Sequence, residues 1–171
     1  VATGILRALR ENGIQLERTE LMAVITGSEE AGLRGAKEWA RRHKKDCDDV
    51  ETIVISLETF GDLPYLAIYN RDMNSTVTLD RDTCDLLKRA AQSTGHELPF
   101  SSVHLGSSDA AAFTQAGFKA AMLGGMDPHP AHYYHNRRDS WELMSEPCMK
   151  AAIEVLIKAI ELYDSESAAV G

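Results

Sequence analysis

The sequence predicts an α/β domain in which helices cover a mostly parallel sheet. Apolar runs rich in β-branched residues alternate with longer segments whose apolar residues recur at helical spacing. The 171 residues are enough for a single domain with one substantial core. Hydrophobic residues make up 44% of the chain and charged residues 26%, which is typical of a globular protein with a polar surface. Strands that alternate with helices favour a layered fold.

Local signals place the elements in order along the chain. The first is a helix in which Val1, Ile5, Leu6 and Leu9 have helical spacing and which Gly13 can end. The other expected elements are a buried strand over 20–26, a helix over 31–45, strands over 52–58 and 64–70, a helix over 80–95, a short helix over 108–117, a strand over 118–124 and a helix over 145–163.

Residue types at the ends of these segments support the assignments. The run at 52–58 is rich in the β-branched residues that strands favour. Asp80 or Asp82 can cap the next helix, and Gly95 lies just past its end.

The helix over 145–163 has the clearest pattern. Ser145 can cap it, and Pro147 falls in its first turn. Its core stripe consists of Ile153, Leu156, Ile157 and Ile160. The residues after this helix are small and polar, so we expect one domain over 1–164 and a tail over 165–171.

Charge and cysteine content narrow the classes of partner. The net charge of −8 argues against nucleic acid or an anionic membrane. The basic stretch at 41–45 lies where a helix is expected to end, and cations there favour the helix dipole. Cys47, Cys84 and Cys148 are far apart and odd in number, which is not typical of a disulfide framework or of a thiolate zinc site. We therefore expect a reducing, cytoplasmic location, and assembly into a homo-oligomer stays open.

Polar residues gather where the predicted strands end, which is where α/β sheets carry their functional groups. Glu29 and Glu30 follow the first strand, Glu58 ends the second, and a histidine-containing loop follows the strand at 118–124. Carboxylate oxygen and imidazole nitrogen are ligands of catalytic zinc. A metal hydrolase also needs a general base, so two adjacent carboxylates could divide the work between metal and proton.

Each of these residues also has a simpler interpretation. Ser28 could cap the following helix, with both glutamates favouring its dipole. Glu58 could face solvent, and His135 could be a polar surface residue.

A second local interpretation is a metal site made by the loop histidines alone. His129, His132 and His135 have a spacing that would place them on one face of a helix. Pro128 and Pro130 disfavour a regular helix there.

Four segments resemble a known family. "VITGSEEAGLRGAKEWA" resembles a strand followed by Gly/Asp-x-Glu-Glu-x-Gly-Leu-x-Gly-Ser/Ala, and "ISLETFGD" resembles a strand that ends in Leu-Asp/Glu-x-x-Gly. "GSSDAAAFTQAGFKAAML" and "YYHNRRDSWELM" resemble Gly-Ser-Asp-x-x-x-Phe-x-x-x-Gly-Ile-Pro and Tyr-His-x-x-x-Asp. In this order they are similar to the dinuclear zinc aminopeptidases, metallopeptidase family twenty-eight, whose relatives include bacterial leucyl aminopeptidases, the glutamate carboxypeptidase II group and glutaminyl cyclases.

The resemblance implies a role for each candidate residue. Glu29 would be the general base acting on metal-bound water, and Glu30 a ligand to one zinc. Glu58 would bind the other zinc, where many members have aspartate, and His135 would be the histidine ligand paired with Glu30. The remaining implied residues are Ser108 and Asp109, which would orient ligands, and Tyr134, which would line the pocket.

The resemblance also implies two ligands that the 171 residues do not contain. The family has a histidine in a His-x-Asp motif and an aspartate that bridges both metals, and none of the six histidines lies in such a motif. The first helix resembles the one that follows the bridging aspartate, so we expect that residue just before Val1. The implied fold is a three-layer α/β/α zinc-exopeptidase-like domain with a mostly parallel mixed sheet that lacks N-terminal strands.

The expected function is that of a zinc-dependent exopeptidase, in the first place an aminopeptidase, acting on peptides or acyl-amino acids. A carboxypeptidase or deacylase of the same clan is the main alternative. A non-catalytic fragment or remnant is the third, because one zinc held by Glu30 and His135 would lack the bridging carboxylate.

Overall fold

The computed structural model describes residues 1–127, 129 and 133–166. These residues form an α/β fold with a five-stranded sheet. Two short 3₁₀ turns, Leu63–Tyr65 and Trp141–Leu143, lie between the main elements. The main elements are α1 (Ala2–Glu11), α2 (Arg34–Asp48), β1 (Ile53–Phe60), β2 (Ala67–Asp72), β3 (Val77–Thr78), α3 (Arg81–Ser93), β4 (Phe100–Ser102), α4 (Asp109–Gln115), β5 (Lys119–Gly125) and α5 (Glu146–Glu166).

The sheet is mixed, and the expectation that most strand pairs are parallel is wrong. Its order is β1-β5-β2-β3, with β4 also paired to β2. The pairs β1–β5 and β2–β4 are parallel, whereas β2–β5 and β2–β3 are antiparallel. The link at 61–66 between β1 and β2 is too short for the crossover that parallel strands need. The strand β2 therefore runs in the direction opposite to β1, and it pairs with β5 in an antiparallel manner.

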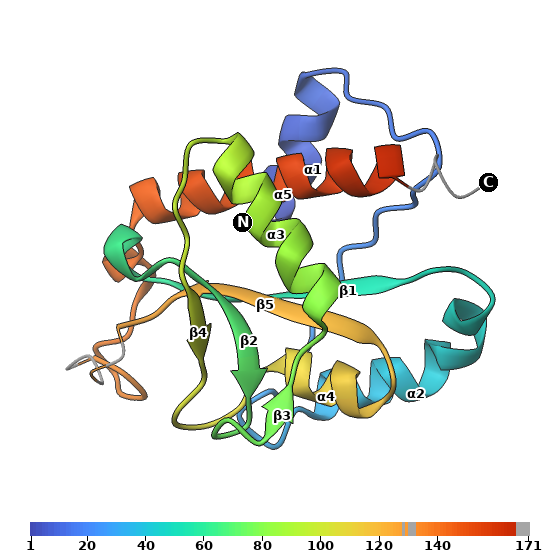
Figure 1. The fold of residues 1–171 in the computed structure, drawn as a ribbon. Helices are drawn as coiled ribbons and strands as arrows, with labels where there is room; N and C mark the ends of the chain where they lie inside the picture. Colours follow the sequence, from blue (N-terminus) through green and yellow to red (C-terminus); the bar gives the residue numbers. More distant parts are fainter. Residues whose placement is uncertain (128, 130–132, 167–171) are drawn as a thin grey trace.

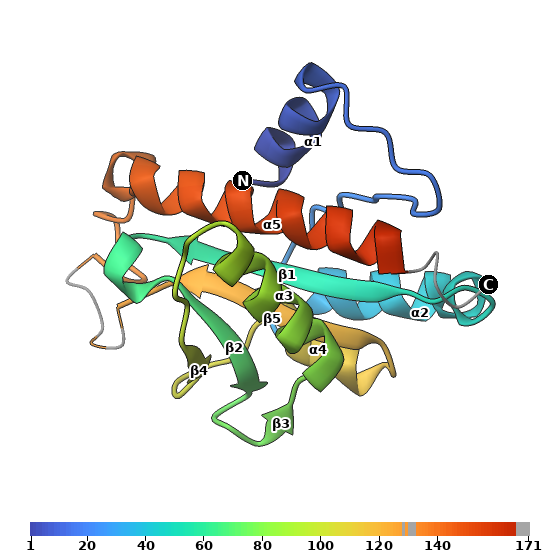
Figure 2. The ribbon, with the colours of Figure 1, turned by 45° about the horizontal axis from the view of Figure 1, so that its top comes forward.

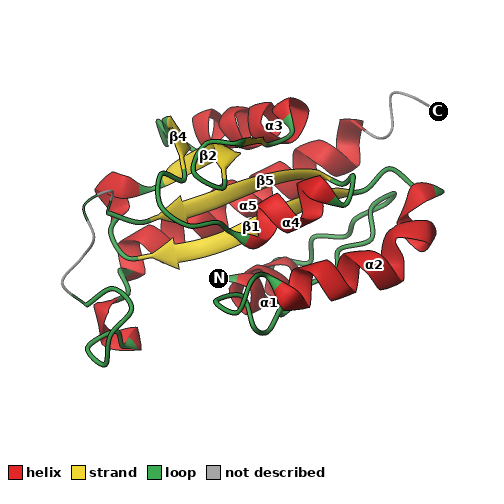
Figure 3. Cartoon of the chain, turned by 90° about the horizontal axis from the view of Figure 1, so that it is seen from below, coloured by secondary structure: helices red, strands yellow, loops and turns green. Residues whose placement is uncertain are grey.

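Helices cover both faces of the sheet. Figures 1 and 3 show α1, α3 and α5 on one face and α2 and α4 on the other. The core lies between these layers, and its largest fully buried apolar side chains include Ile68, Leu87, Met122, Leu123 and Val155. Each such side chain contributes about 1.5–3 kcal/mol when it leaves water. No helix in the described part of the chain is long and apolar enough to cross a membrane.

The expected strand over 20–26 is absent, and the prediction is wrong there. The segment has no ladder partner among the described residues. Leu21 packs against the core, whereas Met22 is 59% exposed and Ile25 is 88% exposed. A strand needs a neighbouring strand to satisfy its backbone, so apolar composition alone does not make one. The other expected helices and strands are present, with ends shifted by a few residues.

The long connection between α1 and α2 is anchored to α5. Figure 2 shows it passing the carboxyl end of α5 before it reaches α2. There the Asp164 carboxylate accepts hydrogen bonds from the backbone N–H groups of Glu17 and Arg18, at 3.0 and 2.9 Å. The helix α5 continues to Glu166, through the first two residues of the expected tail, and 167–171 lie outside the described residues.

Candidate functional site

The paired glutamates lie in a turn before α2. The Glu29 carbonyl accepts hydrogen bonds from the backbone N–H groups of Gly32 and Leu33, at 2.9 and 2.8 Å. Gly35 in the first turn of α2 donates to the Gly27 carbonyl at 2.9 Å. A Cβ on Gly35 would lie 2.4 Å from that carbonyl oxygen, so the close approach requires glycine.

This geometry excludes the simplest interpretation of the pair. The residue before α2 is Leu33, in the left-handed conformation with φ +59°, and no side chain caps the helix there. Ser28 is therefore not the cap, and the glutamates are not in the first helical turn. The turn instead presents Glu29 half-buried and Glu30 exposed.

Glu58 lies within β1, two residues before the strand ends. The neighbouring strand supplies Gly124 in register with it, and a Cβ there would lie 2.6 Å from the Glu58 carbonyl oxygen. The Ser56 hydroxyl donates to the Glu58 carboxylate at 3.2 Å. Burial, followed by the charge of Glu29, raises the pKa of Glu58 to about 7. Glu58 is therefore not the solvated strand-end residue of the simpler interpretation.

His135 and Glu30 meet across 105 residues of sequence. The His135 Nε2 atom lies 2.9 Å from Glu30 Oε1. His135 has a positive φ of 56°, and its ring stacks on that of Tyr134 with centroids 3.9 Å apart. The turn before α2 and the loop after β5 thus bring one carboxylate and one imidazole together.

Ser108 is held by Asp72, a residue that the sequence did not single out. Asp72 is fully buried at the end of β2 and accepts from the Ser108 N–H at 3.1 Å and from its hydroxyl at 2.5 Å. The Ser108 hydroxyl in turn accepts from the Ala110 N–H at 3.2 Å and so caps α4. The strand predicted from the sequence ends at residue 70, whereas β2 continues to Asp72.

Asp109, the first residue of α4, faces the turn of paired glutamates. It is 7% exposed, and its Oδ2 atom accepts a hydrogen bond from the Thr26 hydroxyl. Its buried Oδ1 atom has no hydrogen-bond partner within the described residues. The link to Thr26 ties α4 to the segment that leads into Glu29.

The candidate residues share one electrostatic neighbourhood. Burial raises the pKa of Glu29, the charges of Glu30 and Asp109 raise it further, and His135 lowers it. Burial also raises the pKa of Tyr134, together with the charges of Glu30, Glu29 and Glu58. Because these carboxylates repel one another, a cation placed among them would be stabilised.

The donor set fits a zinc ion by chemistry, but only two donors are adjacent. Glu30 and His135 provide carboxylate oxygen and imidazole nitrogen. Within residues 1–127, 129 and 133–166, no three His, Cys, Asp or Glu side chains form a group that could hold a metal ion. Both adjacent donors are largely exposed, which leaves room for further ligands.

Part of the alternative site made by the loop histidines lies outside the described residues. His132, Pro128 and Pro130 lie outside the described residues. His129 is exposed and lies 3.5 Å from the Asp127 carboxylate.

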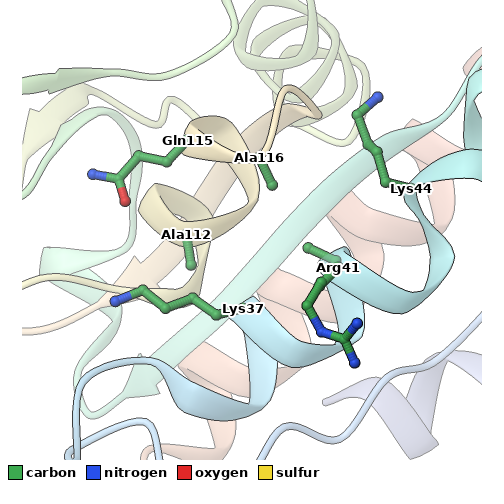
Figure 4. Close-up of a pocket in the computed structure, with 7 residues that line it drawn as sticks. Lys37, Arg41, Lys44, Ala112, Gln115 and Ala116 are labelled. Atoms are coloured by element: carbon green, nitrogen blue, oxygen red, sulfur yellow. The ribbon is translucent and has the colours of Figure 1, made fainter.

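Of two surface hollows among the described residues, one coincides with the candidate site. It measures about 580 Å³ and is lined by Glu30, His135, Asn136, Arg137 and Asp139. The other, of about 350 Å³, lies between α2 and α4 and is lined by alanines, Gln115 and three cations. Figure 4 shows Lys37, Arg41 and Lys44 along α2. These cations already contact Gly32, Glu38 and Asp48.

Comparison with solved structures shows the fold. The TET aminopeptidase from a marine sediment Thaumarchaeota archaeon has a TM-score of 0.65 and 17% identity, covering 93% of this chain and 44% of its own. The zinc aminopeptidase BSAP from Bacillus subtilis has a TM-score of 0.63 and 23% identity, covering 79% of this chain and 34% of its own. An Acidobacteriales bacterium glutaminyl cyclase has a TM-score of 0.61 and 22% identity, with coverages of 78% and 46%.

The chain spans less than half the length of each of these structures. No curated protein matches the chain. The sequence model described as Peptidase family M28 matches residues 1–160, nearly the whole chain. The chain belongs to peptidase family M28.

Proposed function

We propose that this chain carries the general base and part of the metal site of a zinc-dependent exopeptidase, in the first place an aminopeptidase. The observation that supports this most directly is the convergence of Glu29, Glu58 and the Glu30–His135 pair from three separate segments. A metal hydrolase needs these donor types together.

Glu29 is the proposed general base. Its carboxylate is half-buried, and its pKa is raised by burial and by the neighbouring carboxylates. A carboxylate with a raised pKa takes up a proton more readily near neutral pH. Glu29 would accept a proton from the attacking water and return it to the leaving amine.

Glu30 and His135 would hold one zinc ion, and Glu58 would help to hold a second. Bound zinc would supply Lewis-acid polarisation of the scissile carbonyl and would promote deprotonation of water. Tyr134 stacks on the His135 ring and so fixes its orientation. The link from Asp109 to Thr26 holds the segment that precedes Glu29.

A complete two-metal site needs donors beyond these. The histidine and bridging aspartate that the family resemblance implies are not among the 171 residues. This chain would therefore supply the general base and three metal ligands. Peptidase activity would require the histidine and the bridging aspartate as well.

Zinc titration of the chain by isothermal calorimetry tests the metal site. We expect binding of one zinc ion, weakened roughly tenfold or more by Glu30→Ala and by His135→Ala. His129→Ala is the matched control, since this exposed histidine follows β5 but makes no contact with Glu30. Absence of zinc binding, or equal loss with the control, would favour a non-catalytic domain.

A further inference from the structure

We propose that Arg137 binds a carboxylate of the substrate, so that the site prefers peptides with an acidic group beside the scissile bond. This inference rests on the proposed function, because it places the substrate in the hollow next to Glu30 and His135. It adds the class of substrate, which the peptidase family does not specify.

Arg137 lies beside the proposed metal ligands. Its side chain lines the same hollow as Glu30 and His135, together with Asn136 and Asp139. A peptide whose scissile bond reaches Glu30 and His135 therefore passes within reach of a long, flexible guanidinium group.

A β-turn at residues 136–139 presents the Arg137 side chain. The Asp139 N–H donates to the Asn136 carbonyl at 3.0 Å, which makes Arg137 and Arg138 the central residues of a β-turn. The Asn136 side-chain oxygen also accepts from the Arg138 N–H, at 2.9 Å. The backbone of the turn is thus held at two points, and only Arg137 of the two arginines lines the hollow.

The N–H groups of the Arg137 guanidinium are available for a ligand. Its side chain makes no hydrogen bond or ion pair with any residue that the structure describes. Some other arginines in the chain are paired, for example Arg41 with Glu38 and Arg89 with Glu166. A guanidinium presents its N–H groups in a fork that matches a carboxylate.

The charges around the hollow determine where an anionic group of the substrate can bind. Glu30 and Asp139 line the hollow, and Glu29, Glu58 and Asp109 lie near Glu30, so the site is negative and repels an anionic substrate group. Apart from the imidazole of His135, Arg137 is the cation of the hollow. A substrate carboxylate would therefore be stabilised at Arg137.

The carboxylate could be the carboxyl end of a dipeptide or an acidic side chain, and three peptides separate these sources. Dissociation constants of Ala-Glu, Ala-Gln and Ala-Gln amide are measured by NMR titration of the isotope-labelled chain. Tighter binding of Ala-Glu than of Ala-Gln indicates the side chain. Tighter binding of Ala-Gln than of its amide indicates the terminal carboxylate.

We expect at least one of these preferences to be about fivefold, as for a charged hydrogen bond at an exposed site. Arg137→Ala should abolish it and Arg137→Lys should restore part of it, whereas Arg138→Ala, from the same turn, should keep it. Absence of any preference, including absence of any binding, overturns the inference, as does equal loss in the Arg138 variant. Zinc binding without a preference would refute this inference alone, and a preference without zinc binding would refute the proposed function alone.

Discussion

Single residues of the site are defined by burial and by neighbouring charge more than by their own type. Glu58 and Glu30 are both glutamates, yet Glu58 is half-buried in the sheet while Glu30 is exposed on a turn. The pKa of Glu58 rises to about 7. This rise follows from the loss of water around Glu58 and from the charge of Glu29 beside it.

A prediction at this scale concerns the pH dependence of stability without zinc. The folded chain binds a proton at Glu58 more tightly than the unfolded chain does, because the pKa rises from 4.5 to about 7. The stabilisation from this protonation is complete below pH 4.5 and is lost as pH rises through 7. We expect Glu58→Gln to remove this loss, so that the variant gains on the order of 2 kcal/mol over wild type between these limits.

Urea unfolding in EDTA at several pH values measures this difference. The comparison with Glu58→Gln cancels the contributions of other titrating groups, and Glu20→Gln, an exposed glutamate, is the control. If the stability difference between wild type and Glu58→Gln stays constant over this pH range, the pKa of Glu58 is not raised in the folded chain.

At the scale of elements, the most demanding contact is the crossing of the glutamate turn over the start of α2. Gly35 is a helical residue, and by helix propensity alone Gly35→Ala would stabilise the chain by about 1 kcal/mol. Its Cβ would lie 2.4 Å from the Gly27 oxygen, a backbone atom that cannot rotate away.

We therefore expect Gly35→Ala to destabilise the chain by about 1–3 kcal/mol and to weaken zinc binding, since it displaces the turn that carries Glu30. The matched control is Gly27→Ala in the same turn, because a Cβ there would meet no atom within 4 Å. Thermal unfolding and zinc calorimetry measure both effects. A Gly35→Ala variant as stable as Gly27→Ala would show that the turn is not held by this contact.

Much of the element pattern could be predicted from the sequence, for reasons that local chemistry explains. Asp80 caps α3, as its position predicts, by accepting from the Thr83 N–H at 2.8 Å. Strands as short as β3 and β4 give no periodic signal, and they exist because β2 offers backbone partners. The segment at 20–26 shows the reverse case, since it has strand-like composition without a partner.

The candidate site was predictable only where position in the fold or family resemblance added information. The sequence indicates that Glu30 lies in a turn, but the strand expected before it is absent, and it is the turn before α2 and the loop after β5 that bring Glu30 and His135 together. The role of Asp72 does not, because its partner Ser108 lies 36 residues away and only the folded sheet brings them together. Buried hydrogen-bond networks depend on tertiary contacts and leave little local pattern.

At the scale of the whole molecule, the surface combines strong negative charge with an exposed apolar segment. The net charge of −8 keeps copies of the chain apart at low ionic strength. The segment at 20–26 nevertheless exposes Met22, Val24 and Ile25 side by side in sequence. Apolar side chains gathered in this way favour association with another apolar surface.

We therefore predict that the chain self-associates through the segment at 20–26 and that salt strengthens the association, because salt screens the repulsion between copies. Ile25→Lys should shift the chain towards monomer in sedimentation velocity at high salt, since Ile25 is 88% exposed. Leu105→Lys is the matched control, because Leu105 is 72% exposed but lies in another part of the chain. Equal loss of association in both variants would indicate general hydrophobic contact, and association unchanged by Ile25→Lys would exclude this segment as the contact surface.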